Sequence, residues 1–147
     1  PFDDWFNPDS WNARLSETSM DVNAIRPISC IADKPLPTSI KKRLSGDRYK
    51  VTHKTHIINV TVDEVSAANH AFIMSLKKGK RFRFWYETTG GLMFGSNNGI
   101  IATVFGDMVL LRGQGEIMTY QIEVMWESLQ TETYINSPIF EDSGEPL

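Results

Sequence analysis

The sequence of 147 residues lacks the features that mark several classes of protein. A single cysteine excludes an internal disulfide framework and a multi-cysteine metal site. No run of about 18 apolar residues is present, so membrane insertion is not expected. A charged-then-apolar leader is also lacking, which favours synthesis in the cytoplasm.

The chain has little net charge, although its 22% of charged residues is ordinary for a globular protein. The net charge is −3, whereas nucleic-acid-binding proteins usually carry a clearly basic surface, so specific nucleic-acid binding is not expected. Basic residues cluster locally at Lys41–Arg43 and again around Lys77–Arg81. Such clusters are usually solvated faces, and we interpret them in that way.

Side chains able to perform catalysis do not converge on a motif. Cys30 lies in an apolar stretch without a neighbouring cation, which predicts a buried, inert thiol. His53 and His56 are three residues apart in a β-branched segment, and on a strand that spacing puts them on opposite faces. The glycine-rich segment Gly90–Gly95 lacks the lysine and the helix of a phosphate-binding loop. We therefore predict no catalytic residue, no cofactor and no metal site, and a protein that is not an enzyme.

What the sequence does contain is enough apolar material for one domain. Hydrophobic residues make up 41% of the chain, and a domain of this length buries enough surface to need no cross-links. We expect a single domain over residues 24–131, an N-terminal extension over residues 1–23 and a C-terminal extension over residues 132–147.

The N-terminal extension is rich in Asn, Asp and Ser but also contains aromatic side chains. These are Trp5, Phe6 and Trp11. Disordered tails are usually poor in aromatic residues, so the segment is expected to dock on the domain or on another subunit. We treat the three side chains as candidate subunit-interface residues.

The middle of the chain changes from a strand pattern to a helix pattern. Thr55–Val62 alternates with period two and is rich in β-branched residues, which predicts a strand. Asp63 is a candidate N-cap for the helix that follows. Its expected apolar stripe is Val65, Ala68, Phe72, Ile73 and Leu76, with Lys77 and Lys78 in the last turn and Gly79 just beyond it.

The second half of the chain reads as strands joined by short connections. Strands are predicted at Arg81–Glu87, Ile100–Phe105 and Tyr120–Trp126, and Gly106–Asp107 is predicted as a hairpin turn into a strand at Met108–Leu111. Short antiparallel connections predict an α+β fold: a mostly antiparallel β-sheet, or a sandwich- or barrel-like core, with one main helix packed on it.

Between the first two of these strands, Thr88–Gly99 is predicted to be a long hairpin excursion with an apolar tip. Its tip consists of Leu92, Met93 and Phe94, with Gly91 supplying backbone freedom. Exposed apolar patches usually mark interaction sites, so these four residues are further candidate interface residues. The alternative is that the loop folds back and Phe94 caps the core of its own domain.

One stretch of the sequence, from Leu44 to Leu129, resembles a known family. A turn at Gly46-Asp47-Arg48-Tyr49 precedes the strand, the helix runs from Phe72 through Gly79 into the aromatic strand at Phe82 and Phe84, and the last strand alternates apolar residues. This order resembles the minor tail and distal tail proteins of long-tailed bacteriophages and is similar, more loosely, to tail tube subunits. The family turn usually has glycine where this sequence has Arg48.

The resemblance implies a structural component of the phage tail, at the tail tip or in the tail tube, that assembles into a ring. Its implied partners are copies of itself and other tail or baseplate proteins, and its implied location is the virion. An alternative that the composition leaves open is a small-molecule or carbohydrate-binding module with a β-rich core.

Overall fold

The protein is mostly antiparallel β-sheet, as the sequence predicts. The computed structural model describes residues 6–16, 25–28, 30–63, 66–110, 118–129 and 132–138. Within these residues the chain forms two helices and nine strands, and the paired strands whose register is known run antiparallel. The prediction of an α+β fold with a sheet-dominated core is confirmed.

The chain divides into two compact units, each built from separated segments. One unit comprises Pro1–Ile28, Arg83–Ile100 and Glu132–Leu147; we call it the small-sheet unit. The other comprises Ser29–Phe82 and Ile101–Thr131; we call it the large-sheet unit. These bounds differ from the single domain at residues 24–131 that the sequence led us to expect.

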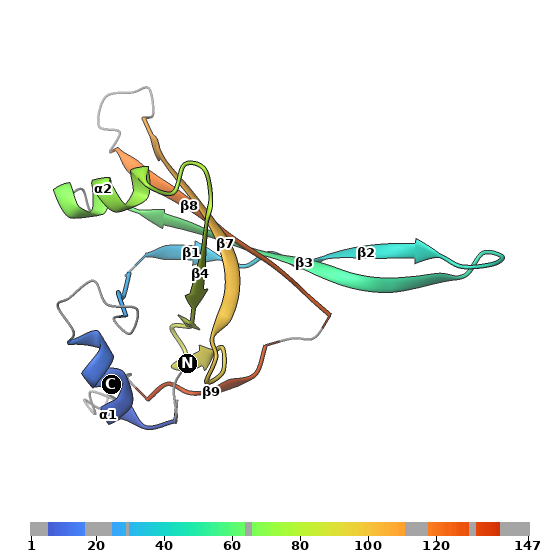
Figure 1. Cartoon of the computed structure of the whole chain (residues 1–147), viewed down its shortest axis with the longest axis horizontal. Coiled ribbons are helices and arrows are strands. Elements are labelled where there is room, and N and C mark those ends of the chain that lie inside the picture. Colours follow the sequence, from blue (N-terminus) through green and yellow to red (C-terminus); the bar gives the residue numbers. More distant parts are fainter. Residues whose placement is uncertain are drawn as a thin grey trace. The chain divides into compact units, whose positions relative to one another are not determined.

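The large-sheet unit is built on a sheet of six strands (Figure 1). The order is β1 (Ile31–Asp33), β3 (Tyr49–Val62), β8 (Thr119–Ser128), β7 (Ile100–Val109) and β4 (Lys80–Phe84), with β2 (Thr38–Arg43) paired to the other end of β3. Ile58 of β3 lies opposite Val124 of β8, which lies opposite Val104 of β7. The predicted strands at Thr55–Val62 and Tyr120–Trp126 are therefore confirmed, and both are longer than predicted.

The two faces of this sheet differ because successive side chains point to opposite sides. One face carries most of the buried residues of the unit. They are His56, Ile58, Val62, Ala102, Val104, Tyr120, Ile122, Val124 and Trp126. The other face carries Asn59, Thr61, Gln121 and Glu123, and we call it the open face. The alternation of the sequence thus translates directly into a core side and a solvent side.

The main helix, α2 (Ala67–Met74), packs through Ile73 and the following Leu76, which are 2% and 0% exposed. Its N-cap is Ser66, whose hydroxyl accepts the Asn69 N–H at 3.2 Å. The predicted cap at Asp63 is therefore wrong, because the strand continues to Val62 and a connection separates it from the helix.

The end of α2 also differs from the prediction. The helix stops at Met74 with Ser75 as C-cap, so Lys77 and Lys78 follow the helix rather than occupying its last turn. Gly79 does have the left-handed backbone expected of it, with φ of 76°. Of the expected apolar stripe, Ala68 is exposed, Phe72 is half-buried, and Val65 lies outside the described residues.

The predicted turn at Gly106–Asp107 is wrong, since both residues lie inside β7. A Cβ atom at Gly106 would stand 3.2 Å from Ile73 Cγ2 and 3.3 Å from Leu76 Cδ1. The glycine therefore allows α2 and its following turn to approach the strand closely, which is the other common reason for a glycine within a strand.

The small-sheet unit contains α1 (Pro8–Leu15) and a sheet of β5 (Tyr86–Glu87), β6 (Leu92–Phe94) and β9 (Tyr134–Asn136). Asn7 caps α1 by accepting the Asp9 N–H. Trp11 of α1 and Met93 of β6 are both 2% exposed and pack together, with Leu15, Ile25, Trp85 and Ile135 around them. The predicted apolar loop tip is thus a strand with a buried centre, and its description as an exposed excursion is wrong.

Candidate functional site

Some of the residues predicted to form a subunit interface are buried within the chain, and others are exposed. Trp11 and Met93 bury their side chains in the core of the small-sheet unit, and the Trp11 and Trp85 rings meet edge to face at 5.4 Å. Phe6 is 62% exposed, and Trp5 lies outside the described residues. An interface role for the exposed Phe6 stays a prediction, whereas Trp11 and Met93 already have partners within the chain.

The remaining predicted interface residues lie in or beside β6. Gly91 takes a φ of 76° in the turn before the strand, and its carbonyl accepts the Ser137 N–H at 2.7 Å. Leu92 and Phe94 are half-buried. Phe94 lies between Tyr86 of β5 and Tyr134 of β9, with ring centroids at 4.7 and 5.5 Å. We call Tyr86, Phe94 and Tyr134 the aromatic row.

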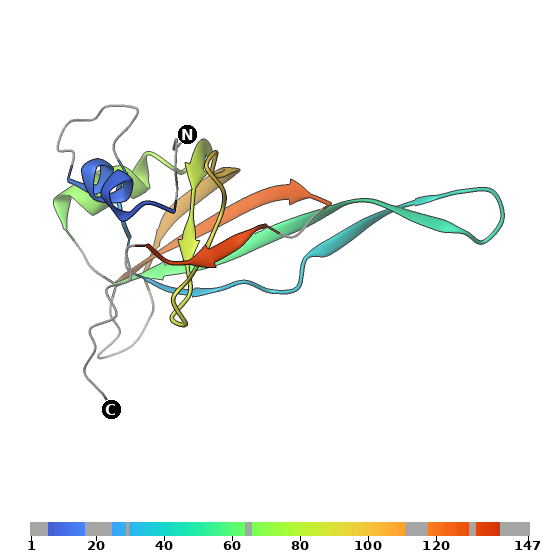
Figure 2. The same ribbon diagram turned by 90° about the horizontal axis from the view of Figure 1, so that it is seen from below.

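A second candidate surface lies in the large-sheet unit, where β2 and the first residues of β3 form a two-stranded ribbon. β8 pairs with β3 only from Lys54 onward, and within the described residues β3 before that point pairs with β2 alone. The ribbon projects past the ends of the other strands of its sheet (Figures 1 and 2). We call Thr38–Thr55 the arm.

The tip of the arm is closed by local interactions. Leu44 N–H donates to the Arg48 carbonyl at 2.8 Å, and Gly46 supplies the positive φ that the turn needs. Arg43 donates to the Gly46 carbonyl and forms an exposed ion pair with Asp47 at 3.6 Å. The chain turns at Gly46 and Asp47, within the turn that the sequence places before the strand, and Tyr49 already belongs to β3. The hairpin that this turn closes was not predicted.

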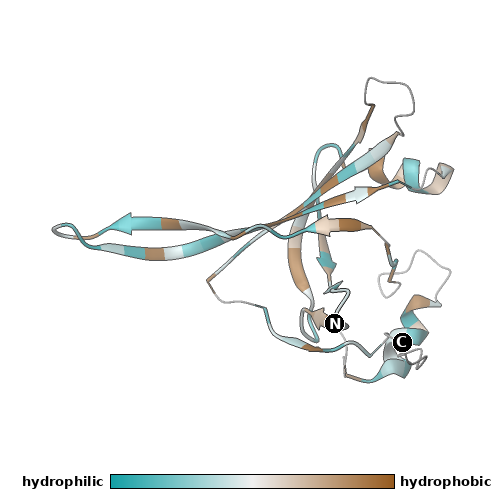
Figure 3. Cartoon of the chain, turned by 180° about the vertical axis from the view of Figure 1, so that it is seen from behind, coloured by the Kyte–Doolittle hydropathy of each residue, from teal (hydrophilic) through white to brown (hydrophobic). Residues whose placement is uncertain are grey.

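The arm concentrates positive charge that the composition of the whole chain conceals. It holds six Lys and Arg residues against the single acid Asp47, a net charge of +5. Since the whole chain carries −3, the rest of the sequence carries −8. Residues Lys41–Lys50 are all exposed, and most of the arm is hydrophilic (Figure 3). The cluster at Lys41–Arg43 that we interpreted as a solvated face is thus one part of a basic ribbon.

Two of these cations lie directly opposite each other on one face of the arm, because Lys42 and Lys50 are partners in the β2–β3 register. A register shift between Ile40 and Lys41 separates this pair from Lys54, which also pairs with Ser128 of β8. We call Lys42 and Lys50 the lysine face. Like charges directly opposite each other are destabilising, so this face is electrostatically costly within the chain. Neither lysine forms an ion pair within the described part of the protein.

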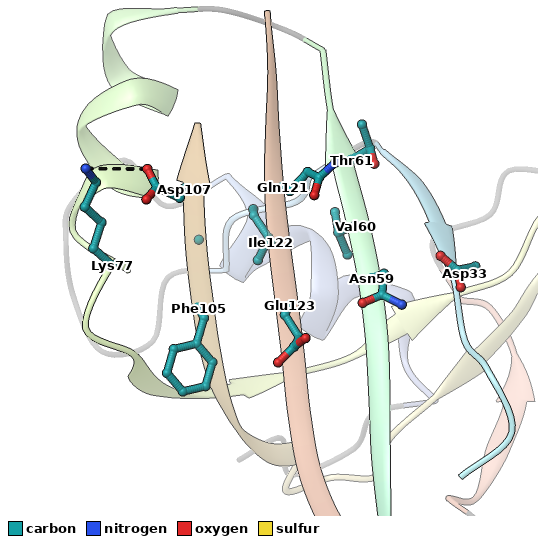
Figure 4. A pocket seen from close by; sticks show the side chains of 11 residues that line it. Asp33, Asn59, Val60, Thr61, Lys77, Phe105, Asp107, Gln121, Ile122 and Glu123 are labelled. Carbon is teal, nitrogen blue, oxygen red and sulfur yellow. Dashed lines mark ion pairs between the residues drawn. The ribbon is translucent and has the colours of Figure 1, made fainter. Parts of the chain in front are cut away.

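The open face of the same sheet contains a depression of about 500 Å³ (Figure 4). Asp33, Asn59, Glu123 and Phe105 form one cross-strand row along its floor, on β1, β3, β8 and β7. The charged groups that line it are Asp33, Glu123, Asp107 and Lys77. We call this hollow the acidic depression, because its lining has a net charge of −2.

Lys77 and Asp107 compensate each other at the rim of the depression, with Nζ and Oδ1 3.5 Å apart. Asp107 also accepts the Met108 backbone N–H at 2.8 Å. That hydrogen bond is the main reason the pKa of Asp107 is lowered from its ordinary value, and Lys77 lowers it further. Asp33 and Glu123 have no ion-pair partner among the described residues, so they form the uncompensated negative charge of the depression.

The histidines considered as metal ligands are held apart by the strand, as predicted. His56 is 3% exposed and stacks on Trp126 at 5.1 Å, whereas His53 is half-exposed and lies 3.5 Å from the Glu127 carboxylate. His70 exchanges a 2.9 Å hydrogen bond with the Tyr120 hydroxyl. In the part of the chain that is described, no group of three or more His, Cys, Asp or Glu side chains is arranged to hold a metal ion.

The interpretation of Cys30 as a buried thiol is wrong. The residue is exposed, because it stands just before the short edge strand β1, whose residues are all exposed. Partial burial still raises the pKa of the thiol, which keeps it in the less reactive protonated form.

Comparisons with known proteins add no relatives to this geometry. No family model matches the sequence, and neither curated proteins nor solved structures give a match. Among the helices described, none is both long and apolar enough to cross a membrane.

Proposed function

We propose that the chain is a non-enzymatic structural subunit of a bacteriophage tail that assembles with copies of itself into a ring or tube. The order of residues between Leu44 and Leu129, with its resemblance to distal and minor tail proteins, supports the tail as its location. Other tail or baseplate proteins are then its further partners, and the virion is where it acts.

The projecting arm is the observation that best supports self-assembly. An isolated two-stranded hairpin is only marginally stable in water, and within the described residues the outer part of β3 pairs with β2 alone. Both long edges of the outer arm therefore present backbone groups that no described strand pairs, and such edges are sites where another chain adds. Contact with a neighbouring subunit would stabilise the arm, and this is the reason that the arm supports self-assembly.

The proposal is tested by shortening the arm without disturbing the sheet. Lys41 and Val51 are cross-strand partners, so replacing Lys42–Lys50 with Asn-Gly closes the hairpin with a two-residue turn of the favoured type. We expect the full chain to form oligomers in sedimentation velocity, with rings or tubes in electron micrographs. The shortened chain should keep its circular dichroism spectrum and sediment as a monomer. A full chain that is monomeric at every soluble concentration would contradict the proposal.

A second candidate, carbohydrate binding, is favoured by the aromatic row of the small-sheet unit. Stacked rings with an exposed end suit the apolar faces of sugars, and Tyr134 is 61% exposed. Partial burial of the Tyr86 hydroxyl is the main reason that its pKa is raised. The neighbouring Glu132 carboxylate, which accepts a hydrogen bond from that hydroxyl, raises the pKa further. Titration with soluble oligosaccharides, followed by tyrosine and tryptophan fluorescence, tests this reading; a response that disappears in Tyr134→Ala would favour it over assembly.

A further inference from the structure

The arm has a net positive charge and the lining of the acidic depression a net negative charge, and both belong to the large-sheet unit. Lys42 and Lys50 place two positive charges opposite each other, and Asp33 and Glu123 flank Asn59 as an uncompensated acidic pair. Neighbouring strands are about 4.8 Å apart, so the two acids stand roughly 10 Å apart across β3, a span that long lysine side chains on adjacent strands can cover.

These two surfaces cannot meet within one copy of the chain. Lys50 and Asn59 lie nine positions apart on the same continuous strand, β3. At about 3.3 Å per residue this separates them by roughly 30 Å along a strand that does not double back. An attraction between the lysine face and the acidic depression is therefore available only between different molecules.

We propose that the lysine face of the arm docks in the acidic depression of a second copy of this chain. The inference rests on the proposed function, since it supplies the contact through which the subunits would assemble. The charge distribution favours a second copy over nucleic acid, because everything outside the arm carries −8 and would repel phosphates.

The geometry of such a contact has a consequence for the assembly. The arm and the depression are different patches, so the contact is head-to-tail rather than two-fold symmetric. Head-to-tail contacts close into rings when the rotation between subunits allows it and otherwise propagate as filaments. Each subunit in the chain of contacts both gives an arm and receives one.

The contact should be sensitive to ionic strength. Exposed charges are screened beyond a Debye length of about 8 Å at physiological salt, and of about 3 Å at 1 M salt. We therefore expect the oligomers to dissociate as the sodium chloride concentration is raised, and to re-form when the salt is diluted. An association held by apolar contacts would not be weakened in this way, because added salt does not screen apolar burial.

The decisive experiment is a charge exchange between the two surfaces, with self-association measured by sedimentation velocity. The double variant Lys42→Glu/Lys50→Glu keeps a like-charged pair at the same register position, so the arm itself is not altered by a new internal attraction. We expect it to weaken self-association by on the order of tenfold to a hundredfold. The converse variant, Asp33→Lys/Glu123→Lys, should weaken it to a similar extent.

Recovery in the combined variant is the specific signature of this pairing. A chain carrying all four substitutions should assemble again, because the two surfaces are complementary once more with their signs exchanged. The two double variants should also associate with each other when mixed. The negative arm of one variant then faces the positive depression of the other, and the unchanged arm of the second faces the unchanged depression of the first. A matched control is Lys78→Glu/Lys80→Glu, which reverses two exposed lysines outside the arm and should leave association unchanged.

The possible outcomes separate this inference from the proposed function. If the full chain oligomerises but the arm variant associates normally, or the four-fold variant fails to recover, the docking inference is wrong while self-assembly stands. If the full chain stays monomeric and instead binds duplex DNA with an affinity that the arm variant loses, both are overturned in favour of a nucleic-acid arm.

Discussion

The two halves of β3 show how one strand serves two purposes. From Lys54 to Val62 it pairs with β8 along its whole length, has β2 or β1 on its other side over part of that length, and buries His56, Ile58 and Val62. From Tyr49 to His53 it belongs to the arm, has β2 as its described neighbour and buries nothing fully. The inner half is held by the core of its own unit, and the outer half is the part for which we propose a second copy of the chain as partner.

The largest loss of stability is expected for a substitution in the core that packs against the inner half of β3. Trp126 of β8 is 5% exposed and stacks on His56 of β3, with Lys34 Nζ 5.7 Å from its ring centroid. Trp126→Ala should lower the free energy of unfolding by about 3–5 kcal/mol, since it removes a large buried ring and leaves a cavity. Denaturant unfolding measures this loss. Met125→Ala, one position along on the open face, is the control and should cost clearly less; equal losses would show that the core side is misassigned.

A smaller effect is expected where the helix closes over the core. Gly106→Val would place side-chain atoms where Ile73 and Leu76 already lie, with the first carbon about 3.2 Å from Ile73 Cγ2. Such overpacking should destabilise the large-sheet unit by about 1–3 kcal/mol. The nearby Thr103→Val, on the open face of the same strand, should change the thermal midpoint very little. A neutral Gly106→Val variant would mean that α2 does not pack against β7.

Gly106 also illustrates what the sequence does and does not reveal. Glycine followed by aspartate predicts a turn from local preferences, whereas here the missing side chain makes room for residues of a helix about 30 positions earlier. The alternation of Thr55–Val62 and Tyr120–Trp126 was interpretable without the structure, because a sheet with one buried face imposes that period itself.

The small-sheet unit was the least predictable part for the same reason. Its strands β6 and β9 have three residues each and are held by pairing between segments about forty residues apart, so local patterns carry little signal. Sequence patterns alone assign Trp11 and Met93 to a subunit interface, because their contact with each other depends on tertiary structure. The basic arm was visible as a charge cluster, and only the hairpin register places Lys42 opposite Lys50.

The smallest effect on stability is expected in the outer half of β3. Val51 is half-buried in the arm, and Val51→Ala should lower the free energy of unfolding by less than about 1 kcal/mol, the range of strand preference and surface substitutions. Thermal unfolding of the dilute protein provides the measurement. A loss as large as that of Trp126→Ala would show that the arm is part of the folding core and would remove the contrast between the two halves.

The most direct test of the account is amide hydrogen exchange along β3, measured in dilute monomer and in assembled protein. Residues 54–62 should be protected in both states, because their protection reflects the core of the large-sheet unit. Residues 49–53, with residues 41–43 of β2, should exchange quickly in the monomer and slow down by at least tenfold on assembly. Equal protection of the arm in both states would contradict the claim that a second copy holds it.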